Sequence, residues 1–280
     1  LLVLGDTNSA LCTISAKRLK IPIFHMEAGN RCFDQNVPEE LNRKIADHTS
    51  DINLTYTENS RRYLLGEGFR KDHVFCVGSP LKEVLDFYSD QISGSLVLEK
   101  LQLNKEKYIV ASIHREENLD IGENFKSIID ALNKIVDLYD AQLIFSTHPR
   151  TKKKIEQLNL KVSSRINFVE PLGFCDYVFL QKNALITLSD SGTISEESTI
   201  LGFKAVSIRT STERPEAIDH GNIILGGIKT ENIINSIDIT LGLKGVSYPP
   251  LEYLKTDNSN TVLKLIQSYT AIINKETWIK

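Results

Sequence analysis

The sequence predicts an α/β protein built from parallel, doubly wound sheets. Its first elements are an apolar strand at residues 1–4, a helical segment at 10–20 and a second apolar strand at 21–26. Such strand–helix–strand units place their strands in parallel, and the strands are apolar because helices cover both faces. The alternation restarts after a polar, charged stretch at residues 89–107, and a chain of 280 residues is long enough for about two domains.

Both halves continue the alternation of apolar strands and helices. Pro38 suits a first helical turn, and short apolar runs suit strands buried in a parallel sheet. The expected strands lie at residues 52–56, 74–78, 108–113, 142–147, 167–169, 184–188 and 205–209, and the expected helices at 38–48, 59–66, 80–88, 124–138 and 174–182. The expected domains are residues 1–95, 96–250 and 251–280.

The last segment is expected to be an amphipathic helix that packs back toward the first domain. Pro249-Pro250 breaks the chain before this helix. Its expected apolar side consists of Val262, Leu263, Leu265, Ile266, Tyr269, Ile272 and Ile273.

Composition argues against several classes of protein. The 33 basic and 36 acidic residues give a net charge of −3, so no basic excess predicts binding to nucleic acid or to an anionic membrane. The 4 cysteines form no Cys-x-x-Cys pair, which predicts neither a zinc site nor a redox motif. No apolar run reaches the roughly 18–20 residues that span a bilayer, and the start has no export signal. We expect a cytoplasmic protein without a metal.

The stretch at residues 188–198 reads as a strand, a tight turn and a helix. Gly192 permits the sharp turn, and the N–H groups at the start of the helix form a site for an anion such as phosphate. Ser191 can add a hydroxyl donor, and Glu197 can accept a hydrogen bond from a sugar hydroxyl. Alternatively, Ser191 only caps the helix and Glu196 and Glu197 only occupy its first turn.

Ionisable residues gather where four expected strands end. The clusters are Gly5-Asp6-Thr7, His25-Met26-Glu27-Ala28-Gly29, His114-Arg115-Glu116-Glu117-Asn118 and Thr147-His148-Pro149-Arg150. Each cluster alone also has a structural explanation. Asp6 can cap a helix, His25 can be a core histidine whose hydrogen bonds are satisfied, and Arg115 can belong to a solvated face. Together they favour a catalytic cleft, because open α/β sheets bind their ligands at the carboxyl ends of the strands.

Ordered motifs across essentially the whole chain resemble the non-hydrolysing UDP-N-acetylglucosamine 2-epimerase family. The matching motifs are Gly5-Asp6-Thr7, residues 25–31, Pro38-Glu39-Glu40-Leu41-Asn42-Arg43, residues 114–118, Ser189-Asp190-Ser191-Gly192 with Glu196-Glu197, and Thr212-Glu213-Arg214-Pro215-Glu216. Residues 33–35, 114–118 and 191–197 look most like the subgroup that acts on UDP-2-acetamido-2,6-dideoxy-L-talose in the L-fucosamine pathway, which supplies capsules and O-antigens. The resemblance implies two Rossmann-like domains in the glycosyltransferase-B arrangement.

The resemblance also implies an isomerase mechanism and a set of site residues. UDP leaves C1 while a base removes the C2 proton, and UDP then adds back with the opposite configuration at C2. No cofactor is implied, and the likeness to the family suggests a homodimer for the full-length protein. The implied catalytic residues are Asp6, Glu27, Glu39 and His114, and the implied UDP-sugar contacts are Tyr177, Ser191, Gly192, Thr193, Glu197 and Arg214.

Two departures from the family pattern leave alternatives open. Gly192-Thr193 and Ser195 stand where the usual pattern has Gly-Gly and Gln, which leaves the sugar undecided. The family's first strand and its Gly-Thr-Arg-Pro-Glu loop have no counterpart, so we expect the start of the first domain to be missing. A UDP-sugar glycosyltransferase and an inactive UDP-sugar-binding fragment remain alternatives. Three arginines inside the motifs either contact substrate or form salt bridges to Glu27 or Glu39; they are Arg31, Arg43 and Arg115.

Overall fold

The structure is a computed structural model that describes residues 1–119, 121–147, 149–243 and 248–280. The chain forms two compact units. Unit 1 contains Leu1–Asp86, Ser211–Glu216 and Pro249–Lys280, and unit 2 contains Phe87–Thr210 and Ala217–Tyr248. The predicted division into residues 1–95, 96–250 and 251–280 stays a prediction. In the part of the chain that the structure describes, no helix is both long and apolar enough to cross a membrane.

The sheet of unit 1 has parallel strands in the order β1-β2-β3-β4. The strands are β1 (Leu2–Leu4), β2 (Phe24–Met26), β3 (Ile52–Thr55) and β4 (Val74–Cys76). Every residue of β3 is buried, as expected for a strand that is covered on both faces. Because β1 and β2 are parallel neighbours, the residues that follow them meet at the same edge of the sheet.

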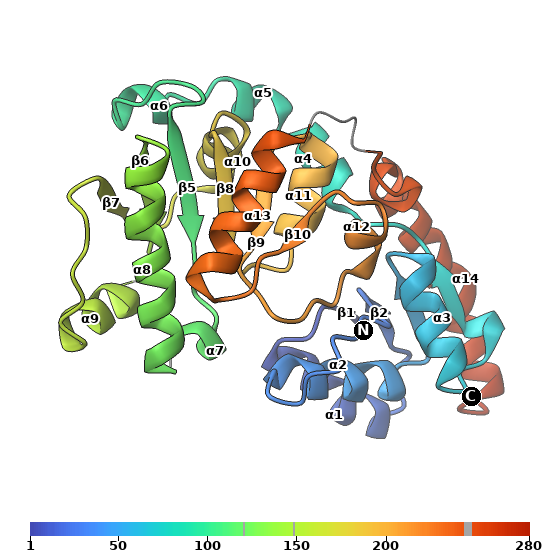
Figure 1. Ribbon diagram of the computed structural model, residues 1–280. Helices are drawn as coiled ribbons and strands as arrows, with labels where there is room; N and C mark the ends of the chain where they lie inside the picture. Colours follow the sequence, from blue (N-terminus) through green and yellow to red (C-terminus); the bar gives the residue numbers. More distant parts are fainter. Residues whose placement is uncertain (120, 148, 244–247) are drawn as a thin grey trace. The chain divides into compact units, whose positions relative to one another are not determined.

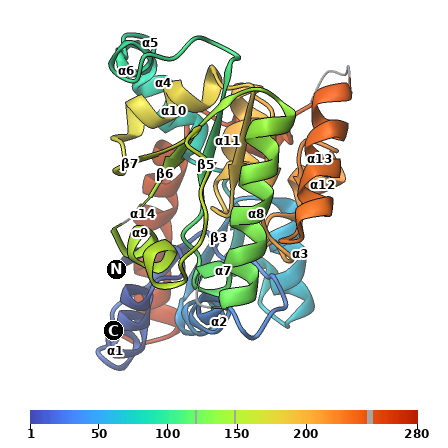
Figure 2. The same ribbon diagram turned by 60° about the vertical axis from the view of Figure 1, so that its left-hand side comes forward.

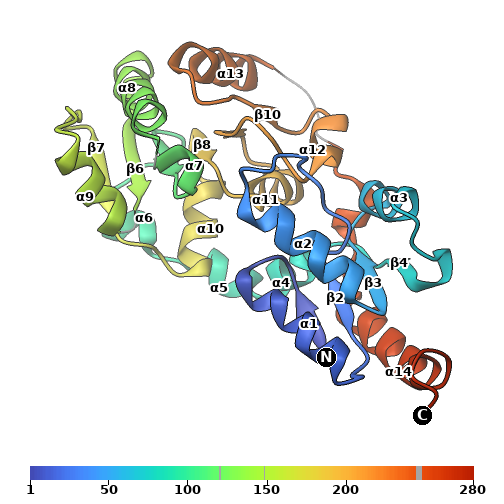
Figure 3. The same ribbon diagram turned by 90° about the horizontal axis from the view of Figure 1, so that it is seen from below.

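Helices cover both faces of this sheet. They are η1 (Asn8–Leu11), α1 (Cys12–Arg18), α2 (Pro38–Thr49), α3 (Glu58–Gly66), η2 (Lys71–His73), α4 (Leu81–Phe87), η3 (Leu251–Leu254) and α14 (Asn258–Glu276). The helix α2 begins at Pro38, which fits a first turn because proline has no N–H to leave unsatisfied there. Figure 3 shows α2 and α14 on opposite sides of β2 and β3.

The helix α14 packs on the apolar face of β2 and β3 with only part of its expected apolar side. Val262 and Ile273 are buried in one cluster with Phe24 and Ile52, and Leu265, Ile266 and Tyr269 pack against that cluster. Leu263 is 65% exposed and Ile272 is 37% exposed, so the prediction that these two side chains belong to the packed side was wrong. The contact surface is narrower than the apolar stripe in the sequence.

The sheet of unit 2 is also parallel, with the order β10-β9-β8-β5-β6-β7. The strands are β5 (Tyr108–Ser112), β6 (Gln142–Ser146), β7 (Ile166–Val169), β8 (Ile186–Ser189), β9 (Ala205–Ser207) and β10 (Ile224–Leu225). The chain builds outward from β5 to β7 on one side and then from β8 to β10 on the other. The order therefore reverses between β5 and β8, and ligands of open α/β sheets bind at such a switch point.

Alternating residues of β5 and β6 face two different apolar layers. Ile109 and Ala111 belong to the cluster that includes α8 and α13, whereas Tyr108 and Val110 belong to the cluster that includes Leu180 of α10. This alternation follows from the two-residue period of a strand. Figures 1 and 2 show α8 and α13 side by side on the first layer. Both faces of the sheet are thus covered, as the apolar strands predict.

The helices of unit 2 include several that the sequence analysis did not identify. The full set in the described residues is α5 (Ser89–Ser93), α6 (Val97–Lys100), α7 (Glu116–Leu119), α8 (Gly122–Leu138), α9 (Pro149–Gln157), α10 (Phe174–Lys182), α11 (Ile194–Leu201), α12 (Pro215–Asp219), which begins in unit 1, and α13 (Thr230–Gly242). The charged stretch 89–107 contains α5 and α6, where Ile92 and Val97 are buried. Tertiary packing stabilises these short helices, which have too few turns to be stable alone.

Candidate active site

In unit 1, the ends of β1 and β2 bring Asp6 and Glu27 to one edge of the sheet. The Gly5 N–H donates to the Met26 carbonyl at 3.1 Å and joins the two turns. A Cβ at Gly5 would lie 3.4 Å from Glu27 Oε2, so the Glu27 carboxylate lies directly against this turn. Glu27 has a φ of 68°, in the left-handed region that non-glycine residues rarely adopt. Strained backbone of this kind is concentrated at functional sites.

Each of these two carboxylates is paired with an arginine. Arg43 of α2 donates to Asp6 Oδ2 from Nη2 at 2.6 Å and from Nε at 3.0 Å. Arg214 donates from Nη2 to Glu27 Oε1 at 2.9 Å, and Asn30 Nδ2 donates to the same oxygen at 3.2 Å. Burial opposes the charged form of Arg43, but the charges of Asp6 and Glu213 outweigh it and raise its pKa. Each carboxylate therefore has a guanidinium partner within the same unit.

The neighbouring residues Glu39 and Glu40 have different environments. Glu40 is buried and accepts hydrogen bonds from the Cys32 N–H at 3.0 Å and from Arg43 Nη1 at 2.9 Å. Burial alone would raise the pKa of Glu40, but the hydrogen bonds from Cys32 and the charge of Arg43 lower it. Glu39 is partly exposed, and its carboxylate makes no hydrogen bond or ion pair within the described part of the chain. Glu40 is therefore structural, and Glu39 remains available for chemistry.

His25 occupies a buried position between a carboxylate and a carbonyl. Its Nδ1 lies 2.8 Å from Asp47 Oδ1 and its Nε2 lies 3.0 Å from the Gly5 carbonyl oxygen. Both neighbours can only accept hydrogen bonds, so this geometry requires the doubly protonated imidazolium. Burial opposes that charge, but the hydrogen bond and charge of Asp47 outweigh it and raise the pKa of His25. The interpretation of His25 as a satisfied core histidine is confirmed.

The raised pKa of His25 predicts a specific pH dependence of stability. The stabilisation is complete below the unfolded histidine pKa of about 6.5 and is lost as the pH rises through the higher folded value. Asp47 and Glu27 are the charged groups that favour the imidazolium, and Arg31 shares Asp47. We expect urea denaturation to show this decrease in wild-type protein and a flatter profile in His25→Gln. Parallel pH profiles in the two proteins would contradict the assignment.

Arg31 is structural in this arrangement. Its side chain is fully buried and donates to Asp47 Oδ2 at 2.7 Å and to Glu67 Oε2 at 2.6 Å. Arg43 pairs with Asp6 and Glu40. Both arginines form salt bridges, but the predicted partners Glu27 and Glu39 were wrong.

In unit 2, the candidate residues meet at the switch point between β5 and β8. His114 follows β5, and Asp190 follows β8. Asp190 is fully buried, and both its oxygens accept from the His114 N–H, at 3.1 and 3.0 Å. The His114 side chain is 58% exposed, with Nδ1 at 3.2 Å from Asp190 Oδ1. Arg115 donates from Nε to the Asp190 carbonyl at 2.9 Å, so it is not simply part of a solvated face.

The turn after β8 carries hydroxyl groups and leads into α11. Ser191 Oγ lies 2.9 Å from Thr193 Oγ1, and Thr193 rather than Ser191 is the N-cap residue, with no side-chain capping hydrogen bond. Ser191 Oγ nevertheless accepts from the Thr193 N–H at 3.4 Å, which is the capping contact that the alternative predicts. Glu197 accepts from Gln181 Nε2 at 2.9 Å, which orients this carboxylate in the first turn of α11. Burial raises the pKa of Tyr177.

The structure thus groups the predicted residues by unit. Asp6, Glu27, Glu39 and Arg214 belong to unit 1, and His114, Tyr177, Ser191, Gly192, Thr193 and Glu197 belong to unit 2. His148, in the fourth predicted cluster, lies outside the described residues. Sequence reasoning did not assign roles to Glu40, Asp47 or Asp190, although Glu40 and Asp190 lie inside the motifs. Among the described residues, no cluster of histidine, cysteine, aspartate and glutamate side chains could hold a metal ion.

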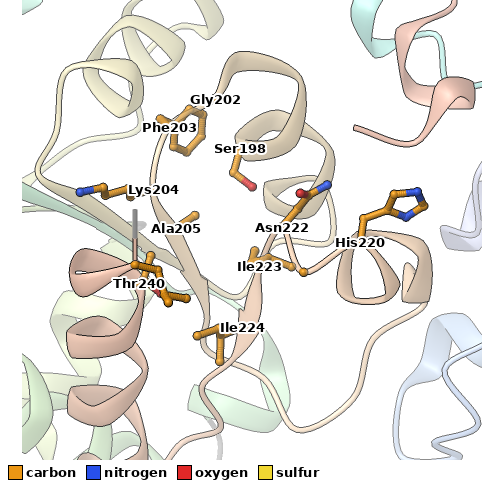
Figure 4. Close-up of a pocket in the computed structure, with 12 residues that line it drawn as sticks. Ser198, Gly202, Phe203, Lys204, Ala205, His220, Asn222, Ile223, Ile224 and Thr240 are labelled. Atoms are coloured by element: carbon orange, nitrogen blue, oxygen red, sulfur yellow. The ribbon is translucent and has the colours of Figure 1, made fainter. Parts of the chain in front are cut away.

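A separate cavity of about 280 Å³ lies at the opposite end of the unit 2 strands (Figure 4). Its lining includes Lys204 and Ala205 at the start of β9 and Ile223 and Ile224 at the start of β10. The candidate residues follow the carboxyl ends of the strands, whereas this cavity lies at the amino ends. It therefore does not belong to the candidate active site.

Comparisons with known proteins agree on one family. The family described as UDP-N-acetylglucosamine 2-epimerase matches residues 1–267. A UDP-N-acetylglucosamine 2-epimerase from Methanocaldococcus jannaschii is 36% identical over 256 residues, which are 86% of this chain and 68% of the relative. A UDP-2,3-diacetamido-2,3-dideoxy-D-glucuronate 2-epimerase from Pseudomonas aeruginosa is 33% identical over 244 residues, 86% of this chain and 67% of the relative.

Solved structures give the same result for the fold. A UDP-N-acetylglucosamine 2-epimerase from Rickettsia bellii matches with a TM-score of 0.93 and 43% identity, covering 100% of this chain and 76% of that one. The M. jannaschii enzyme in complex with UDP-GlcNAc and UDP matches with a TM-score of 0.88 and 33% identity. The match covers 95% of this chain and 75% of the M. jannaschii chain. The predicted fold class is confirmed, and this chain belongs to the UDP-N-acetylglucosamine 2-epimerase family of epimerase-type isomerases.

Proposed function

We propose that the protein inverts C2 of a UDP-N-acetylamino sugar without a cofactor, by elimination and re-addition of UDP. The observation that carries the proposal is the pair of carboxylates at the ends of β1 and β2. Asp6 and Glu27 come from different turns, and each accepts a hydrogen bond from an arginine. A glycosyltransferase must stabilise the departing diphosphate but does not need several groups that transfer protons. An epimerase needs such groups at C2, so this pair of carboxylates favours epimerisation.

In the proposed mechanism, one carboxylate of unit 1 takes the C2 proton while the C1–O bond breaks. The bonding pair of that C–O bond goes to the phosphate oxygen of UDP, and the C2–H pair forms the double bond of a glycal. A second carboxylate supplies a proton to the other face of C2 as UDP adds back to C1. Asp6, Glu27 and Glu39 are the proposed proton carriers. Glu39 has no ion-pair partner among the described residues, so its carboxylate can exchange a proton there without breaking an ion pair.

The proposed UDP contacts are mostly in unit 2. The helix α11 follows a parallel strand at the switch point of the sheet, where helix N-termini bind phosphate groups in this fold class. Ser191, Gly192 and Thr193 would bind the diphosphate, Glu197 a ribose hydroxyl, Tyr177 the nucleotide and His114 the departing phosphate. Arg214 would add charge-assisted hydrogen bonds to the diphosphate. The M. jannaschii relative, whose structure holds UDP-GlcNAc and UDP, supports the proposal that this chain binds a UDP-sugar.

The identity of the sugar is a narrower proposal. The candidates are UDP-N-acetylglucosamine with its manno epimer, and UDP-2-acetamido-2,6-dideoxy-L-talose with UDP-N-acetyl-L-fucosamine. Relatives of similar identity are named for different UDP-amino sugars, so overall identity does not choose between them. We propose that the product serves capsule or O-antigen synthesis and that the complete protein is a homodimer. Turnover of a panel of UDP-amino sugars tests the identity of the sugar, and sedimentation of the purified protein tests the homodimer.

The elimination mechanism predicts exchange of one specific hydrogen. When a UDP-amino sugar is converted in D₂O, we expect the product to carry deuterium at C2, because the proton leaves to a carboxylate and a solvent-exchanged proton returns. Mass spectrometry and proton NMR of the isolated product measure the incorporation. A sample of product incubated in D₂O without protein controls for spontaneous exchange. Turnover that leaves the original hydrogen at C2 would exclude the elimination mechanism.

A further inference from the structure

We propose that Asp190 is the positioning residue of His114, fixing the imidazole so that Nε2–H points outward as a donor to the departing phosphate oxygen. The kinetic part of this proposal rests on the proposed function. The geometric part, which concerns the imidazole orientation, does not depend on any activity.

The first argument is that Asp190 organises the loop after β5. Its Oδ2 accepts from the Arg115 N–H at 2.9 Å and from Asn118 Nδ2 at 3.0 Å. Asn118 also donates to the Ile208 carbonyl beyond β9 at 3.1 Å, and the Asp190 N–H donates to the Ser112 carbonyl at 3.2 Å. One fully buried carboxylate therefore connects the carboxyl ends of β5, β8 and β9. A buried carboxylate with this many donors has a fixed position and orientation.

The second argument concerns the imidazole itself. His114 Nδ1 lies 3.2 Å from Asp190 Oδ1, a distance at which a bare ring nitrogen would face the carboxylate lone pairs, so the contact favours a hydrogen on Nδ1. The Nε2 atom is then the nitrogen available to a ligand, and the exposed side chain makes it accessible. A buried carboxylate beside one ring nitrogen favours the tautomer that carries its hydrogen there. In the imidazolium, Nε2 becomes a charge-assisted hydrogen-bond donor.

These two arguments give Asp190 a defined part in the reaction. When the C1–O bond breaks, negative charge develops on the phosphate oxygen that receives the bonding pair. A hydrogen bond from the His114 imidazolium is stronger to that oxygen than to the ester oxygen of the intact substrate. An interaction that is stronger in the transition state than in the bound substrate accelerates the step. Asp190 does not touch the substrate and transfers no proton. It acts through His114.

The geometric test uses protein labelled with ¹⁵N at histidine. Long-range ¹H–¹⁵N spectra report which ring nitrogen carries the hydrogen, and His114→Gln identifies the His114 signals by their loss. We expect neutral His114 in wild-type protein to be protonated at Nδ1, and this preference for Nδ1 to weaken in Asp190→Asn. A wild-type His114 protonated mainly at Nε2 would overturn the proposal, even if the Asp190 variant failed to fold.

The kinetic test is a double-mutant cycle. Asp190→Asn is expected to lower kcat by about 10- to 100-fold with KM changed by less than about 3-fold, as for loss of an interaction made only in the transition state. In a His114→Gln background the same substitution should cost less than about 3-fold, because residues that act as a unit are not additive. Equal losses in both backgrounds would show that Asp190 acts only on the fold.

Asn118→Ala is the matched control. It removes a donor to Asp190 and the connection to Ile208, but it leaves the contact between Asp190 and the imidazole. We expect lower stability in this variant with the His114 tautomer unchanged. If no variant or wild-type protein epimerised any UDP-amino sugar, the proposed function would fail while the tautomer measurement still decided the positioning role of Asp190.

Discussion

Neutralising any one of the three proposed proton carriers is expected to lower kcat by about 100-fold or more while UDP affinity stays nearly unchanged. The substitutions are Asp6→Asn, Glu27→Gln and Glu39→Gln. Each keeps the size of the side chain and removes its ability to exchange a proton. Steady-state kinetics measures the loss of turnover, and calorimetric titration with UDP measures affinity.

Glu39→Gln is the most informative of the three variants. Asp6→Asn and Glu27→Gln each remove the partner of an arginine, so part of their effect can be structural. Glu39 has no such partner among the described residues, and its substitution changes little besides proton exchange. Glu58→Gln, in an exposed pair with Arg61, is the matched control and should retain wild-type kinetics. If UDP affinity fell as much as turnover, these carboxylates would be binding or structural residues.

Replacing Arg31 with methionine is expected to lower the free energy of unfolding by about 3–5 kcal/mol, as when one partner of a buried ion pair is removed. Arg31 and Asp47 are both fully buried, and the substitution leaves the Asp47 carboxylate without its guanidinium partner. Asp47 also accepts from the Gly29 N–H, so the turn after Glu27 should loosen as well. Urea denaturation with a spectroscopic readout measures the change.

The surface pair of Arg61 and Glu58 provides the control for this prediction. Arg61→Met removes the same kind of side chain from a partly exposed helix pair and should cost less than about 1 kcal/mol. The result also decides between the two roles considered for Arg31. A variant of normal stability with a raised KM would make Arg31 a substrate contact, and the structural assignment would be wrong.

The sequence by itself determined the fold class, the positions of most strands and the family. Short apolar runs are sufficient for this because a strand covered on both faces must be apolar along its length. The same pattern places Asp6, Glu27, His114 and Ser191 after strands, and parallel strands bring such residues to one edge within each sheet. These conclusions need only local pattern and the direction of the strands.

Only the tertiary structure decided what each of these side chains does. Glu39 and Glu40 are identical residue types at adjacent positions, so the sequence does not distinguish them. Adjacent side chains on a helix point in directions about 100° apart, and only Glu40 is buried against the N–H groups of residues 32 and 33. Several deciding partners are distant in the sequence: Glu67 lies 36 residues from Arg31, Asp6 lies 37 residues from Arg43, and His114 lies 76 residues from Asp190. Hydrogen bonds of this kind depend on distances and angles in the assembled sheet, and residue identity alone does not specify them.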